Sequence, residues 1–203
     1  MEGKISESSE HHKKCFVLSP IGDPNTEARR MADQVFKFII KPAVGDWYEP
    51  IRGDQISEPG MITTQVIQHV LDSELVIANL TGGNPNVYYE LALRHMTLKP
   101  CIQMIKKGEK IPFNVSGLRT ILYDLDPEAV QDAKRELQTQ IRSVKGGVKM
   151  DTPISVSQVL RYFEQRENPE MYINIEKIFM NNAPRLAEEL MKRFFQSRGE
   201  KQE

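Results

Sequence analysis

Short apolar runs alternate with amphipathic segments along most of the chain. Five runs have the length and the continuity of buried strands: residues 15–19, 47–51, 74–80, 100–105 and 120–123. Four segments between and after these runs repeat apolar residues at the spacing of a helix: residues 26–41, 62–71, 87–97 and 127–144. We expect Pro42 to end the first of these helices, and Asn84 or Asn86 to cap the third.

This alternation of strand and helix predicts a doubly wound α/β domain, with a mainly parallel sheet and helices on both faces. We expect five strands in the flavodoxin-like order 2-1-3-4-5, with residues 74–80 in the centre because that run is the most continuous. The domain is expected to span residues 15–147. A disordered leader at residues 1–14 would precede it, and a C-terminal helical extension at residues 148–203 would follow a glycine-bearing linker.

The composition is that of an ordinary globular protein, with 39% hydrophobic and 27% charged residues. A formal net charge of -1 gives no overall attraction to nucleic acid, so we expect no sequence-specific nucleic-acid partner. No apolar run reaches the roughly 20 residues of a membrane span, which predicts a cytoplasmic protein without a membrane partner. Cys15 and Cys101 each lie at the start of a strand-like run and are expected to be small buried residues, without a disulfide or a metal site.

Polar residues follow the predicted strands at the carboxyl edge of the sheet. In an open α/β sheet ligands bind at this edge, at the point where the strand order reverses. In the order 2-1-3-4-5 this crevice lies between the first and third strands, so residues 19–25 and 81–86 reach it from two loops. Arg52 and Asp54 come from the end of the second strand, and Glu90 follows in the first turn or so of the helix after residues 81–86.

Residues 75–96 (LVIANLTGGNPNVYYELALRHM) combine an apolar strand, a loop and a helix that opens with an aromatic residue before Glu-Leu. Together with FVLSPIGD at residues 16–23, this stretch resembles the nucleoside 2-deoxyribosyltransferase superfamily. That superfamily includes deoxynucleotide N-hydrolases and lies close to the Toll/interleukin-receptor (TIR)-like NAD-cleaving domains. The resemblance covers about residues 14–125 and implies the same fold. It also implies that Glu90 is catalytic and attacks or stabilises the anomeric carbon of a ribosyl group while the base departs.

Departures from the family pattern bear on whether hydrolysis or base exchange is the expected reaction. Deoxyribosyltransferases carry an aspartate six residues before the glutamate, where Asn84 stands, and an acidic residue on the preceding helix, where Gln65 and Val66 stand. The resemblance therefore implies hydrolysis of an N-glycosidic bond rather than exchange of bases. Chemistry supports the role of Glu90, because a carboxylate beside the sugar stabilises the oxocarbenium character that develops during cleavage. The alternative is that Glu90 only favours the helix dipole and pairs with Arg94 one turn later.

Nine further residues are candidates for substrate binding: Ser19, Gly22, Asp23, Arg52, Asp54, Asn84, Asn86, Tyr88 and Tyr89. Ser19 and Gly22 would hold a phosphate through a hydroxyl and backbone amides, or else form a plain turn. Arg52 and Asp54 would contact phosphate and ribose hydroxyls, or else pair with each other on a solvated loop. The two tyrosines would stack on a base or nicotinamide, although we expect one of them to pack in the core. His95 is expected to be a packed helix residue rather than a general acid.

The sequence thus predicts an N-glycosidase that hydrolyses the base–ribosyl bond of NAD or a related (deoxy)nucleotide. The nucleotide is the substrate, and no separate cofactor is expected. Analogy with the family suggests an effector of prokaryotic antiphage defence with a defence-system protein as partner. Two alternatives stay open: a nucleotide-binding sensor without turnover, and a module that assembles through the tail. Numerous apolar positions in the tail predict a homo-oligomer, unless the tail caps its own chain.

Overall fold

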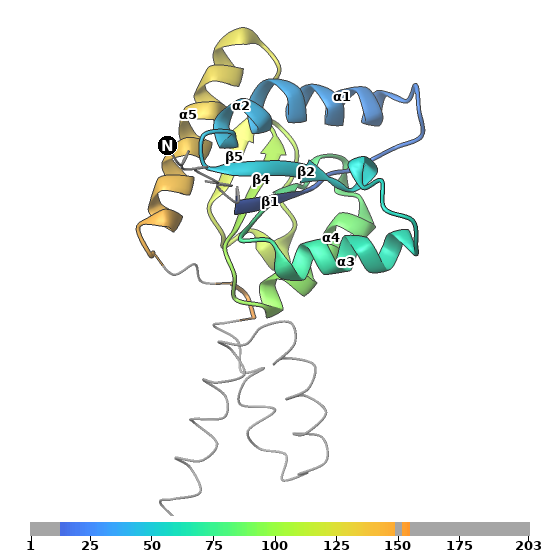
Figure 1. Cartoon of the computed structure of the whole chain (residues 1–203). Coiled ribbons are helices and arrows are strands. Elements are labelled where there is room, and N and C mark those ends of the chain that lie inside the picture. Colours follow the sequence, from blue (N-terminus) through green and yellow to red (C-terminus); the bar gives the residue numbers. More distant parts are fainter. Residues whose placement is uncertain (1–12, 149–151, 155–203) are drawn as a thin grey trace, which may run out of the picture.

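The centre of the molecule is a sheet of five strands, in which each hydrogen-bonded pair is parallel (Figure 1). The computed structural model describes residues 13–148 and 152–154. The strand order is β2-β1-β3-β4-β5, which confirms the predicted fold class and order. All residues of β3 are buried, in agreement with its central place. The strands are β1 (Lys13–Leu18), β2 (Tyr48–Arg52), β3 (Leu75–Asn79), β4 (Cys101–Lys106) and β5 (Thr120–Tyr123).

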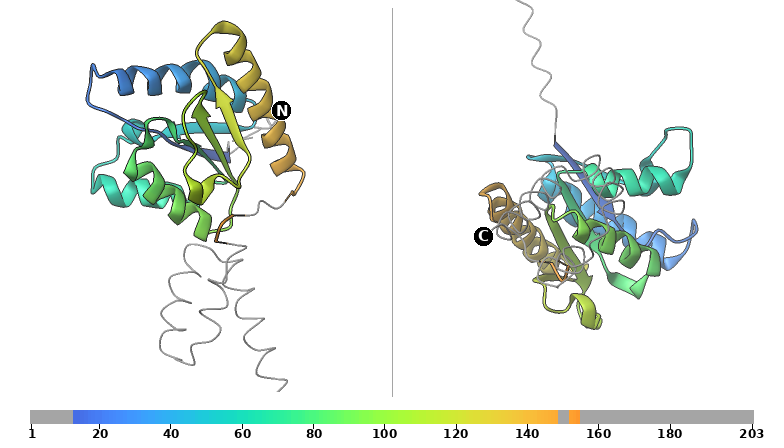
Figure 2. Two further views of the ribbon diagram at one scale, coloured as in Figure 1. Left: turned by 180° about the vertical axis from the view of Figure 1, so that it is seen from behind. Right: turned by 90° about the horizontal axis from the view of Figure 1, so that it is seen from below.

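Helices cover both faces of the sheet, as Figure 2 shows from behind and from below. On one face α1, α2 and α5 pack on the strand residues Val17 and Ile77, and on the other α3 and α4 pack on Leu18 and Ala78. Neighbouring strand residues thus contribute to opposite cores, as the alternation of side chains along a strand requires. The helices are α1 (Glu27–Val35), α2 (Lys41–Val44), α3 (Ile62–Asp72), α4 (Pro85–Met96) and α5 (Pro127–Lys145).

The first helix continues past Pro42, where the sequence predicts its end. A π-helical turn at Phe36–Ile40 joins α1 directly to α2. In this turn the N–H of Lys41 donates to the carbonyl of Phe36, five residues earlier. A proline in an ordinary helix presses on the carbonyl four residues earlier and has no N–H to donate. The wider π turn relieves this conflict, so the helix extends to Val44.

The first strand begins two residues before the predicted start of the domain. Lys13 and Lys14 belong to β1 rather than to the leader, because they pair with the start of β2 and the Lys14 N–H donates to the Glu74 carboxylate at 2.7 Å. Exposed lysines carry no apolar signal, so the sequence pattern missed this end of the strand. The remaining leader, residues 1–12, lies outside the described residues. So does most of the predicted helical extension, residues 155–203.

The two cysteines are buried and free, as predicted from their places in the strand-like runs. Burial raises the pKa of the Cys15 thiol, and it raises the pKa of Cys101 to about 12. Both thiols are therefore neutral at physiological pH and act as small core residues. Within residues 13–148 and 152–154, no helix is long and apolar enough to cross a membrane.

Candidate active site

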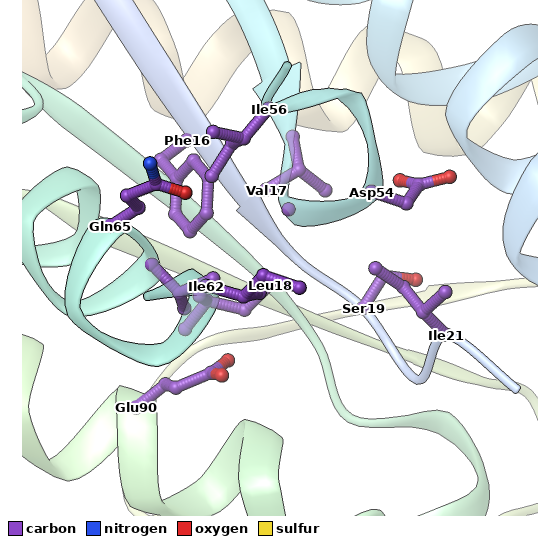
Figure 3. Close-up of a pocket in the computed structure, with 12 residues that line it drawn as sticks. Phe16, Val17, Leu18, Ser19, Ile21, Asp54, Ile56, Ile62, Gln65 and Glu90 are labelled. Atoms are coloured by element: carbon purple, nitrogen blue, oxygen red, sulfur yellow. The ribbon is translucent and has the colours of Figure 1, made fainter. Parts of the chain in front are cut away.

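A pocket of about 330 Å³ opens at the carboxyl end of β1, between the turn that follows β2 and the helices α3 and α4 (Figure 3). Its walls are mainly apolar, and four polar side chains line it: Ser19, Asp54, Gln65 and Glu90. It lies at the carboxyl edge of the sheet, but its lining includes no residue of β3 or of the loop after β3, which the sequence was expected to bring to the crevice. The remaining lining residues are Phe16, Val17, Leu18, Ile21, Gly53, Ile56, Ile62 and Val66.

Glu90 reaches the pocket from the second turn of α4. This helix begins where Asn84 caps it, with the Asn84 side chain accepting a hydrogen bond from the Asn86 N–H at 2.9 Å. Pro85 occupies the first helical position, where its missing N–H costs nothing. Figure 3 shows the Glu90 carboxyl group directed into the pocket. The cap and the proline therefore set the point from which Glu90 faces a ligand.

The Glu90 carboxyl group has no protein partner among the described residues. No hydrogen bond or ion pair of that part of the chain engages it, and burial raises its pKa to about 7. A carboxylate whose pKa lies near neutrality, in an apolar pocket, is typical of catalytic acids and nucleophiles. The group is free to interact with a bound molecule.

Arg94 does not pair with Glu90. The structure therefore departs from the alternative in which Glu90 only favours the helix dipole and pairs with Arg94. The guanidinium group is fully buried and makes five hydrogen bonds to main-chain carbonyls at 2.7 to 3.2 Å, which use all its N–H donors. These carbonyls lie at the end of α3 and at the starts of β3 and β4, and belong to Val70, Ser73, Glu74 and Pro100. Burial lowers the pKa of Arg94 to about 10, so the group stays charged at physiological pH.

Asp54 enters the pocket wall from the turn after β2, held by two arginines. Arg52 donates to it from Nε at 2.6 Å and from Nη2 at 2.8 Å, and Arg29 of α1 donates from Nη2 at 2.6 Å. Asp33 completes the cluster by accepting from Arg52 Nη2 at 2.5 Å and from Arg29 Nε at 3.2 Å. Burial alone would raise the pKa of Asp54, but the hydrogen bond from Arg52, the charges of both arginines and a main-chain hydrogen bond lower it below its usual value. Asp54 is therefore ionised at neutral pH.

The pairing of Arg52 with Asp54 matches the alternative in which they bind each other, although the Arg52 side chain itself is buried. Arg52 is only 3% exposed and lies outside the pocket lining. Three of its donors are taken up by carboxylates, and Nη1 is buried without a partner. Contact of Arg52 with a phosphate stays a prediction, and very little of its surface is exposed for that purpose.

The loop after β1 contributes Ser19 to the pocket, but neither Gly22 nor Asp23. The Asp23 carbonyl accepts from the Thr26 hydroxyl at 2.7 Å, and that hydroxyl caps α1 by accepting from a main-chain N–H at 3.2 Å. A Cβ atom at Gly22 would meet Thr26 Oγ1 at 2.6 Å, so the turn requires glycine there. These residues shape the entry to α1, and phosphate binding by them stays a prediction.

The loop after β3 lies beside the pocket without lining it. The Gly82 N–H donates to the Glu109 carboxylate at 2.8 Å, and Thr81 shares a buried hydrogen bond with the Tyr123 hydroxyl at 2.6 Å. Asn84 and Asn86 form the cap of α4 and are also absent from the lining. These contacts fix the start of the helix that carries Glu90.

The remaining candidates, Tyr88, Tyr89 and His95, differ in how deeply their side chains are buried. Tyr88 packs against the core, and its hydroxyl donates to the Leu80 carbonyl at 3.4 Å, which confirms that one tyrosine packs inward. Tyr89 is 60% exposed and outside the pocket lining, so stacking on a base stays a prediction. His95 is a packed helix residue as expected, and it borders a second cavity of about 230 Å³ with Gln103. Burial and the charge of Arg94 lower the pKa of His95 to about 4, so the ring is neutral.

Sequence reasoning missed the apolar walls of the pocket. Ile62 begins the segment whose apolar residues repeat at helical spacing; in the structure it is the first residue of α3, is 72% exposed and lines the pocket. Gln65 also lines it, and its amide donates to the Glu58 carbonyl at 2.9 Å, which ties the preceding loop to α3. The sequence signal that could have revealed this wall is an apolar residue at the start of a helix that follows a polar loop. In the parts of the chain that the structure covers, no cluster of His, Cys, Asp and Glu could hold a metal ion.

No protein-family model matches this chain, and no curated protein matches it. Structural neighbours are a CMP N-glycosidase and a 2-deoxyribosyltransferase. The Clostridium botulinum CMP N-glycosidase BcmB is 16% identical, with a TM-score of 0.40 over 59% of this chain and 97% of that chain. The 2-deoxyribosyltransferase from Leishmania mexicana is 14% identical, with a TM-score of 0.38 over 55% of this chain and 75% of that chain. Both are similarities of fold.

Proposed function

We propose that this chain is an N-glycosidase that cleaves the base–ribosyl bond of a nucleotide or nucleoside, with Glu90 as the catalytic carboxylate. The observation that supports this is the carboxyl group of Glu90, directed into an apolar pocket at the carboxyl edge of the sheet. Its pKa of about 7 leaves a large ionised fraction at neutral pH. The resemblance of residues 75–96 to N-glycosidic enzymes adds to this support.

The reaction needs one face of the sugar to meet Glu90. The bond between C1′ and the base nitrogen breaks, and its electron pair leaves with the base. The Glu90 carboxylate stabilises the positive charge that develops at C1′, or forms an ester with it. A water molecule then adds its oxygen to C1′, and its proton balances the charge on the departed base. The apolar walls strengthen the attraction between carboxylate and sugar, because they exclude water from the site.

The charges of the lining favour the sugar and base as the parts of the substrate held inside the pocket. Asp54 and Glu90 are carboxylates, and the lining contains no lysine or arginine. Phosphates of a nucleotide substrate would therefore lie outside these walls, near the main chain of residues 19–25. NAD or a related (deoxy)nucleotide as substrate, and antiphage defence as the setting, are parts of the proposal that rest on the resemblance alone.

A substrate panel tests the proposed reaction. The full chain is incubated with NAD, with the ribonucleotides and deoxyribonucleotides, and with their nucleosides, and free base is measured by chromatography. We expect base release from at least one member of the panel. Tight binding of a nucleotide without release of base would instead support the alternative of a sensor.

A further inference from the structure

The Asp54 carboxylate lies in the pocket wall, where two arginines hold it. Arg52 donates to it at 2.6 Å on Oδ1 and at 2.8 Å on Oδ2, and Arg29 donates at 2.6 Å on Oδ2. A main-chain hydrogen bond of Asp54 itself also lowers the pKa of this carboxyl group. The Asp54 side chain is 16% exposed and lines the pocket, so a molecule in the pocket can meet it.

Arg29 holds the Asp54 carboxylate from a second element of the fold. Arg52 stands two residues before Asp54 in the chain and is buried, so its bonds are part of the local turn. Arg29 comes from another element, α1, and adds a second bond to Oδ2. Asp33, one turn further along α1, accepts from Arg29 Nε and holds the guanidinium in place. Two arginines and two aspartates thus alternate in a cluster without net charge.

We propose that Arg29 is a positioning residue, which fixes the Asp54 carboxylate so that it accepts a hydrogen bond from a hydroxyl group of the substrate's sugar. The inference rests on the proposed function, since it concerns the sugar in the same pocket. Figure 3 shows Asp54 and Glu90 on opposite sides of the pocket. A ribose anchored to Asp54 through its hydroxyls can present C1′ to Glu90.

The electrostatics of the cluster agree with a hydrogen-bond acceptor rather than a proton donor. Both arginines lower the pKa of Asp54, and they also lower the pKa of Asp33, where the hydrogen bond from Arg52 is the largest cause. An ionised carboxylate donates no proton and binds hydroxyl groups strongly. The charged groups that face Asp54 are Arg52 from β2 and Arg29 from α1, with Asp33 behind them.

The test compares Arg29→Gln with Arg30→Gln, which removes the same charge from an exposed neighbour on the same helix. Binding is measured by calorimetry in Glu90→Gln protein, so that no turnover occurs. The ligands are adenosine, cytidine, guanosine and uridine, each with its 2′,3′-dideoxy counterpart. With Arg29 present we expect the ribonucleoside to bind on the order of tenfold more tightly than its counterpart. Arg29→Gln should abolish this preference, Arg29→Lys should restore part of it, and Arg30→Gln should leave it unchanged.

A second readout is independent of any ligand. The pKa of the Asp54 carboxyl group is measured by carbon NMR in the wild type and in both variants. We expect Arg29→Gln to raise this pKa and Arg30→Gln to leave it unchanged. An unchanged pKa in Arg29→Gln, or an unchanged preference for ribonucleosides, would overturn the positioning role while leaving the proposed function intact. Absence of binding and of base release with every ligand would contradict the proposed function as well.

Discussion

At the scale of single residues, the protonation of Glu90 governs the proposed reaction. Burial raises its pKa to about 7, whereas the arginines around Asp54 hold that carboxylate ionised at lower pH. The two carboxylates of the pocket are thus kept in different states by their surroundings, which is a common arrangement in glycosidases. Asp54 is charged over the whole range in which Glu90 titrates.

The pH dependence of activity should follow Glu90. A carboxylate that stabilises C1′ must be ionised, and its pKa in the folded protein is raised to about 7. We therefore expect kcat/KM to increase about tenfold per pH unit below this value and to level off above it. Steady-state assays across the range give the profile. A kcat/KM that declines as the pH rises through 7 would assign Glu90 as a general acid instead.

Arg94 is predicted to be a stability residue rather than a catalytic one. Arg94→Met would leave the carbonyls of Val70, Ser73 and Pro100 buried without their donors. We expect a loss of about 3 kcal/mol or more in the free energy of unfolding, measured by urea titration. Arg135→Met is the control, because that side chain is 72% exposed and should change stability by less than about 1 kcal/mol. Equal losses in the two variants would contradict this account of Arg94.

At the scale of elements, the start of α4 connects the loop after β3 to Glu90. Asn84→Ala removes the cap and should lower the free energy of unfolding by about 0.5 to 2 kcal/mol. Asn84→Asp keeps the cap, because aspartate caps a helix as well as asparagine does. It also restores the acidic residue that the resemblance assigns to transferases, so we expect base exchange when an acceptor base is added. Thermal unfolding and exchange assays measure the two effects, and a failure of Asn84→Asp to exchange bases would count against its role.

The sequence predicted the elements better than their ends. The five strands and their order follow from the alternation of apolar and amphipathic segments, since parallel sheets need helical crossovers. Passage of the first helix through Pro42 could not be predicted, because it depends on a π turn without a sequence signature. The position of Glu90 was predicted, whereas the contacts of Arg29 and Asp33 with Asp54 join residues that only the folded chain brings together.

At the scale of the whole molecule, the described residues form a doubly wound sheet, and the candidate pocket lies at the carboxyl edge of that sheet. Most of the predicted helical tail falls outside the described residues. The apolar residues of positions 155–203 still predict self-association, because a solvated segment would not carry so many. We expect light scattering to show an oligomer for the full chain and a monomer for a chain that ends at Gly147. A full-length protein that stays monomeric over a wide concentration range and is active alone would rule out assembly through the tail.

The most direct test of the central claim is base release by Glu90→Gln protein. The substitution removes the charge with little change in volume, and Glu27→Gln on α1 removes an exposed carboxylate outside the pocket as a control. Circular dichroism and thermal unfolding establish that both variants are folded. With the substrate found in the panel, we predict that Glu90→Gln loses base release by a factor of about a thousand or more, whereas Glu27→Gln keeps it. Substantial base release by folded Glu90→Gln protein would contradict the assignment of Glu90 as the catalytic carboxylate.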